Sequence, residues 1–223
     1  MAIAQEAGDE STTARAFRAL GTLALRQKDN LAGRALLTQA LELFRHVDEQ
    51  WGIGGTLSNL GIIAQNEGDL AGAQALYLES LTILKQLGAK YPLGFPLRQL
   101  GLLAVLRGDY ERAGVFMRES LSLNIDVGDK RGIAACLVAV ASLYAARGRL
   151  ADAARLCGAA EALLDAIHTQ IFPYDQEQNE RNLAALCAQL GPAAFEAALA
   201  AGRLLTLEQA IALALVEPLS ADQ

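Results

Sequence analysis

The chain has 223 residues, of which 52% are hydrophobic and 5% aromatic, and its formal net charge is −6. This acidic balance without a basic cluster argues against direct binding of nucleic acid. No apolar run approaches the roughly 18 residues of a membrane-spanning helix, so a membrane protein is not expected. Alanine and leucine dominate the apolar residues and only five prolines occur, which predicts an all-α protein.

The first ten residues, MAIAQEAGDE, lack the basic and apolar regions of a signal peptide. Gly8 and Asp9 stand 120 positions before Gly128 and Asp129, which close a later repeat. We therefore expect residues 1–10 to be the tail of a preceding repeat. The three cysteines, at wide spacings and odd in number, are typical of reduced thiols. Together these features predict a cytoplasmic protein.

From residue 11 onward, anchor residues return every 40 positions. Small residues stand at Gly21, Gly61, Gly101 and Ala141. A second small position recurs at Gly33, Ala73, Ala113 and Ala153. A shared period of this length indicates a repeat array, and it divides the chain into units at 11–50, 51–90, 91–130 and 131–170.

Each unit is predicted to contain two helices. The first carries apolar residues at helical spacing, as Phe17, Leu20 and Ala24 do. A short polar turn follows, in which a glycine such as Gly68 can take the left-handed conformation and the next residue, Asp69, can cap the second helix. The small anchors are expected to let neighbouring helices approach closely.

Residues 171–223 depart from the repeat and are predicted to form C-terminal capping helices. We expect a helix at about 175–190, a second one starting at Pro192, and a last one opened by a capping box of Thr206 and Gln209. The segment 168–180 interrupts the repeat with an aromatic and proline-rich stretch. It is interpreted as a connector, with a binding loop as the alternative.

The Leu-Gly pair followed by alanine, a small residue, a large residue and another small residue resembles the tetratricopeptide repeat. In the second unit these positions are filled by Leu60, Gly61, Ala64, Ala73, Tyr77 and Ser80. The period of 40 exceeds the usual one of about 34, as in the longer-repeat subfamily. This resemblance implies a single right-handed α-solenoid of antiparallel helix pairs, a tetratricopeptide superhelix.

The C-terminal segment also resembles the end of bacterial regulators of the LuxR-type and predicted-ATPase class, in which a nucleotide switch precedes a tetratricopeptide sensor arm. The resemblance implies a protein-binding or effector-sensing arm that serves signal transduction or transcription regulation. A stand-alone tetratricopeptide adaptor that binds a peptide is the alternative. A helical enzyme is the third class of function considered, and an enzyme is not expected, because it would need a constellation of residues that the sequence does not show.

The sequence singles out no catalytic, cofactor-binding or metal-binding residue. Its two histidines and three cysteines lack metal-ligand spacing, and a Cys–His pair stays open because its members need only meet in space. The glycines at 52, 54 and 55 lack the third glycine of a dinucleotide-binding loop. Their place at a junction of two repeats gives them a structural role.

The first helix of each unit is expected to line the concave face of a solenoid. Its first half is basic and polar, which predicts binding of a protein or peptide, such as an acidic or C-terminal segment or another part of the parent protein, or of a small effector. The candidate binding residues are Arg15, Arg18, Thr22, Arg26, Ser58, Asn59, Gln65, Asn66, Phe95, Arg98 and Gln99. The exposed first repeat also predicts a homodimer or aggregate formed through residues 1–27.

Overall fold

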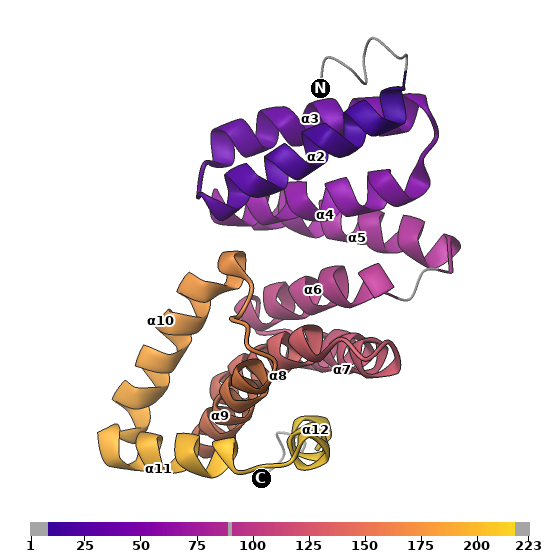
Figure 1. Ribbon diagram of the computed structural model, residues 1–223. Coiled ribbons are helices and arrows are strands. Elements are labelled where there is room, and N and C mark those ends of the chain that lie inside the picture. The colour runs from indigo at the N-terminus through magenta and orange to yellow at the C-terminus, as the bar shows by residue number, and fades with distance from the viewer. Residues whose placement is uncertain (1–8, 89–90, 217–223) are drawn as a thin grey trace. The chain divides into compact units, whose positions relative to one another are not determined.

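The computed structural model describes residues 9–88 and 91–216, together with their side chains except those of Tyr91 and Tyr174. Within these ranges the chain forms eleven α-helices, one short 3-10 helix and no strand, and consecutive helices pack in pairs (Figure 1). The predicted all-α fold of solenoid-like helix pairs is therefore confirmed. The expected repeat tail at residues 1–10 lies largely outside the described residues.

The repeat array contains the helices α2 (Glu10–Arg26), α3 (Asn30–His46), α4 (Gln50–Asn66), α5 (Leu70–Gln86), α6 (Gly94–Leu106), α7 (Tyr110–Asp126), α8 (Lys130–Ala146) and α9 (Leu150–Ala166). The 3-10 helix Tyr91–Leu93 precedes α6. After the array come α10 (Pro173–Leu190), α11 (Pro192–Arg203) and α12 (Leu207–Leu215).

The helices of the array share one length and one step. All of them except α6 are 17 residues long, and a three-residue turn separates each from the next within a pair. Two helices with their turns therefore fill 40 residues, which is the period of the sequence anchors.

The turns repeat one backbone geometry every 20 residues. The residue two positions after each helix end has a left-handed φ between 51° and 83°, which glycine adopts without strain. These positions are Lys28, Asp48, Gly68, Gly88, Gly108, Gly128, Gly148 and His168. At the next residue, Asp29, Asp69 and Asp109 accept a hydrogen bond from the backbone N–H three residues on, whereas Arg149 makes no such bond. The predicted turn chemistry is therefore present.

The small anchors allow close approach of the two helices of a pair. A Cβ at Gly21 would lie 2.7 Å from Leu37 Cγ, and one at Gly61 would lie 2.5 Å from Tyr77 Cε1. At Gly101 the nearest atom is Cγ of Met117, at 2.8 Å. In each case a large side chain of the second helix occupies the space that a side chain on the first helix would need.

Contacts divide the chain into two compact units, 1–100 and 101–223. In the first unit, α2 packs on α3, α3 on α4, and α4 on α5. In the second, α7 packs on α8 and α8 on α9, while α9 is covered by α10, α11 and α12. None of the helices described here is long and apolar enough to cross a membrane.

The C-terminal helices begin where the sequence predicted. Gly191 has a φ of 81° and separates α10 from α11, and Thr206 with Gln209 forms the capping box of α12. The buried Tyr144 hydroxyl donates a hydrogen bond to the Leu213 carbonyl of α12 at 2.8 Å. Because α10 starts at Pro173, the connector between α9 and α10 covers only residues 167–172. The remainder of the predicted interruption is helical.

Candidate functional site

The first unit contains a hollow of about 480 Å³ between α2 and α4, which we call the arginine hollow. Its lining includes most of the polar candidates that the sequence placed on the first two units. The lining residues are Arg15, Arg18, Ala19, Thr22, Leu23, Arg26, Gly55 and Asn59. Arg15, Arg18, Thr22, Arg26 and Asn59 were all predicted as binding residues, and the structure brings these five together.

Arg18 lines this hollow and lies against two aromatic rings. Its guanidinium carbon lies 5.2 Å from the centroid of the Trp51 ring and 5.7 Å from that of Phe44, which are cation–π distances. Burial lowers the pKa of the Arg18 guanidinium from its ordinary value, with Glu49 opposing this effect. The group still carries its charge at neutral pH, so a half-buried and positioned cation faces the hollow.

The other two arginines stand at positions of greater exposure. Nη2 of Arg15 lies 3.2 Å from Oε1 of Glu49, a carboxylate that also accepts a hydrogen bond from the Ser11 hydroxyl. Arg26 is exposed in the last turn of α2. Exposed ion pairs such as Arg15–Glu49 are weak, so an incoming anion can compete with Glu49 for Arg15.

Polar and small residues complete the hollow. Asn59 Nδ2 donates to Thr22 Oγ1 at 2.9 Å, and that hydroxyl donates to the Arg18 carbonyl at 2.8 Å. This leaves the amide oxygen of Asn59 and its second N–H for a ligand. A Cβ at Gly55 would lie 2.7 Å from Arg18 Nη1, so glycine leaves room for the guanidinium.

The glycine cluster of α4 has a separate packing reason at each position. Gly52 lies against the Phe44 ring and Gly54 against Leu84, while Gly55 borders Arg18. These contacts give each of the three glycines a packing role.

Three other candidates are buried, which corrects their placement on an exposed surface. Ser58 hydrogen-bonds Ser80 of α5 at 2.8 Å, inside the α4–α5 interface. Arg98 and Gln99 are buried as well, and Arg98 lies 5.5 Å from the centroid of the Phe95 ring. These residues were selected by helical spacing. That spacing does not separate residues that face a packing partner from residues that face solvent.

The remaining candidates lie outside the arginine hollow. Gln65 is half-buried and accepts a hydrogen bond from the Tyr77 hydroxyl at 3.2 Å. Asn66 is exposed and donates to Asn30 at 3.3 Å. Phe95 is half-buried and meets Tyr77 edge to face, with ring centroids 6.1 Å apart. These three side chains already make structural contacts.

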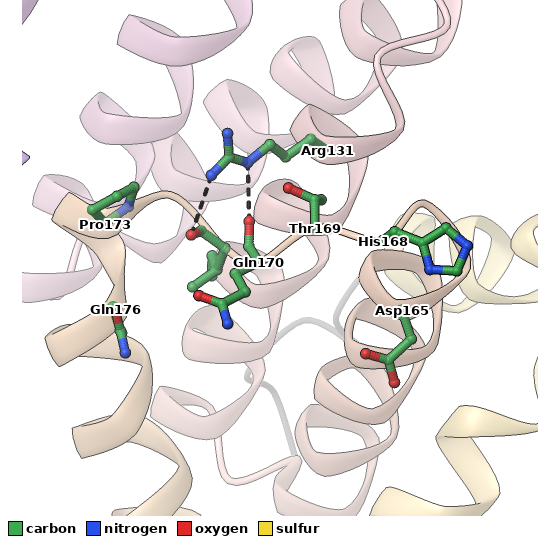
Figure 2. A pocket seen from close by; sticks show the side chains of 8 residues that line it. Arg131, Asp165, His168, Thr169, Gln170, Pro173 and Gln176 are labelled. Carbon is green, nitrogen blue, oxygen red and sulfur yellow. Dashed lines mark hydrogen bonds between the residues drawn. The ribbon is translucent and has the colours of Figure 1, made fainter.

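A second hollow, of about 780 Å³, lies in the second unit beside the α9–α10 connector (Figure 2). Arg131 of α8 donates from Nε to the Gln170 carbonyl at 3.0 Å and from Nη2 to the Ile171 carbonyl at 3.3 Å. Its guanidinium also lies 4.1 Å from the centroid of the Phe172 ring. Arg131 thus ties the α9–α10 connector to α8 by hydrogen bonds.

Asp165 and His168 border this second hollow at the end of α9, across from Gln176 of α10 (Figure 2). The sequence analysis did not predict this hollow. It forms where the chain returns from α9 to α10, at the interruption of the repeat for which a binding loop was the alternative interpretation.

Two of the three cysteine side chains are withdrawn from solvent. Cys136 and Cys157 are buried and Cys187 is half-buried. Burial, with the negative charge of Glu161 as a smaller cause, raises the pKa of the Cys157 thiol to about 12. The reactive thiolate form of Cys157 is therefore scarce at neutral pH. Residues 9–88 and 91–216 contain no group of three or more His, Cys, Asp or Glu residues arranged to hold a metal ion.

No protein-family model matches this chain, and a search of the curated proteins finds no match to it either.

Proposed function

We propose that the chain is a protein-interaction scaffold of the tetratricopeptide type, which captures an acidic peptide segment in the arginine hollow. The observation that carries this proposal is the convergence of Arg15, Arg18 and Arg26 on one hollow in a protein whose net charge is −6. Guanidinium groups present forked donors that match carboxylates. The chain as a whole is acidic, whereas the arginine hollow gathers three positive charges. The hollow is therefore the place where an anion is attracted.

The size and lining of the hollow favour a short peptide segment over a bare ion. A volume of about 480 Å³ is within the range of sites that enclose a small organic ligand or a few residues. Ala19 and Leu23 add apolar walls, and Asn59 adds a donor and an acceptor for a peptide backbone. An acidic segment with one or two small apolar residues fits this combination.

We further propose that this scaffold is the arm of a bacterial signalling or transcriptional regulator. In that protein it would sense a partner or an effector. The support is the resemblance of the repeats and the C-terminal helices to the arms of such proteins. A coding region that joins a nucleotide-switch module to this chain would favour the regulator. A free-standing reading frame would favour the adaptor.

The binding proposal is tested by fluorescence anisotropy with a labelled octapeptide of alternating Glu and Ala that has a free C-terminal carboxylate. Arg15→Glu combined with Arg26→Glu is expected to weaken binding by about tenfold or more, since two attractive charges become repulsive. These side chains are exposed, so the double variant should fold like the parent. Arg18 is left unchanged because it also contacts Phe44 and Trp51.

Two further variants sharpen the test. Arg34→Glu reverses a charge on α3, outside the arginine hollow, where Arg34 pairs with Glu67, and it should leave the affinity within about twofold. Glu49→Gln removes the carboxylate that competes for Arg15 and should strengthen binding. Equal weakening by Arg34→Glu and by the double variant would mean nonspecific attraction and would contradict the proposal.

A further inference from the structure

An exposed tryptophan of α4 borders the arginine hollow. Trp51 is 46% exposed and lies in the first turn of α4. Its ring centroid lies 5.2 Å from the guanidinium carbon of Arg18, which lines the hollow. Gly55, another lining residue, follows Trp51 by four positions and therefore stands on the same face of α4. The indole thus continues the wall of the hollow past Gly55.

The repeat does not require a large apolar side chain at the position of Trp51. The equivalent residue is Ser11 in the first unit, Tyr91 in the third and Arg131 in the fourth. The Ser11 hydroxyl donates a hydrogen bond to Glu49, and Arg131 donates to carbonyls of the α9–α10 connector. Because helix pairs form with polar residues at this position, packing within the array does not account for the indole.

The two rings beside Arg18 differ in their access to solvent. Phe44 is fully buried and therefore serves the packing of the first unit, whereas Trp51 presents open apolar surface next to a cation. Tryptophan and arginine are among the residue types most enriched at the binding hot spots of protein interfaces. The indole and the arginines together therefore favour a ligand that has an apolar part as well as carboxylates.

We propose that Trp51 determines the specificity of the arginine hollow, and that the acidic segment bound there carries an aromatic side chain that packs on the indole. This inference rests on the proposed function, because the arginines must hold the carboxylates of the same segment. An aromatic side chain is favoured over an aliphatic one, since two rings attract each other beyond the effect of the apolar area that they bury.

The test compares the labelled octapeptide of alternating Glu and Ala with four derivatives, each of which has one Ala replaced by Phe. At least one derivative is expected to bind the unmodified chain about tenfold more tightly in fluorescence anisotropy. Trp51→Ala is expected to reduce this ratio of affinities to about one. Because the ratio is the measured quantity, an effect of Trp51→Ala on Arg18 that both peptides share cancels.

The matched control is Leu20→Ala. Leu20 is 44% exposed on α2, much as Trp51 is on α4, and it does not line the hollow. The ratio of affinities should therefore stay at about tenfold. The chain contains one tryptophan, so its fluorescence emission reports on the proposed contact. The emission is expected to move to shorter wavelength when the tighter-binding Phe peptide, without its label, covers the ring.

The possible results separate this inference from the proposed function. If none of the peptides binds, the arginine-hollow proposal fails and the role of Trp51 fails with it. If the Glu-Ala peptide binds and Arg15→Glu with Arg26→Glu weakens it, but no Phe peptide binds more tightly, only the role of Trp51 is overturned. A tenfold gain that persists in Trp51→Ala, or disappears in Leu20→Ala, would place the aromatic side chain elsewhere and overturn that role as well.

Discussion

At the scale of single residues, the helix pairs depend on matching a small side chain with a large one. Gly21, Gly61 and Gly101 each face a large residue 16 positions later, namely Leu37, Tyr77 and Met117. In the fourth unit the first position is Ala141 and the residue 16 positions later is Cys157. A larger residue on one helix thus accompanies a smaller one on the other, which keeps the helices at a similar separation.

This matching was predictable from the sequence, because both members recur at the same period. The environments of Arg18 and Arg98 were not predictable from the sequence. Both residues occupy the same repeat position, yet one borders a hollow and the other is buried. The difference arises from neighbouring residues such as Trp51 and Phe95, which do not belong to the repeat pattern.

A close contact between α9 and α11 in the second unit gives a sharp prediction about Gly158. A Cβ at Gly158 of α9 would lie 2.1 Å from the Leu199 carbonyl oxygen of α11, and backbone atoms have no rotamer by which to withdraw. We expect Gly158→Ala to lower the free energy of unfolding by about 3 kcal/mol. Urea denaturation followed by circular dichroism measures this loss.

The control for this prediction is Gly114→Ala in α7. A Cβ there would meet only the flexible end of Arg118, at 3.2 Å, so the better helix propensity of alanine should stabilise the protein by about 0.5–1 kcal/mol. If the two substitutions had the same effect, α9 and α11 would not be in backbone contact.

At the scale of helices and turns, the 20-residue step combines a fixed helix length with one turn geometry. The left-handed residue follows the helix end. An aspartate then caps the next helix at Asp29, Asp69, Asp109 and Asp129, whereas Glu49 and Arg149 make no such bond. Both signals are local in sequence, which is why the helix ends could be predicted closely. The start of α6 differs because Pro92 and Pro96 stand in the first part of that unit and the 3-10 helix Tyr91–Leu93 precedes α6.

The turn geometry predicts opposite effects for two substitutions. Gly68 has a φ of 83° and no atom near a would-be Cβ, so Gly68→Ala should cost about 1 kcal/mol through backbone strain alone. Asp48 has a φ of 54° in the equivalent turn, and Asp48→Gly should stabilise the protein by about 0.5 kcal/mol. Thermal unfolding of both variants checks the signs. A neutral Gly68→Ala would show that this turn relaxes without cost.

At the scale of the whole molecule, the repeat pattern predicts the helices and their pairing, but it does not predict the two hollows. The arginine hollow could be foreseen in part, because Arg15, Arg18, Thr22 and Arg26 lie on one face of a helix. The hollow beside the connector forms between α9 and α10, after the repeat has ended. Arg131, which ties the connector to α8, carries no signal that distinguishes it from an ordinary surface arginine.

Hydrogen–deuterium exchange with and without the Glu-Ala octapeptide tests the proposed binding site most directly, because it reports on both compact units at once. The arginine-hollow proposal predicts slower amide exchange in residues 15–26 and 55–59 when the peptide is present. Exchange in residues 165–176, beside the second hollow, should be unchanged. The peptide is used at a concentration at which the fluorescence-anisotropy signal no longer rises. Protection confined to residues 165–176, or no protection in residues 15–26, 55–59 and 165–176, would contradict the account.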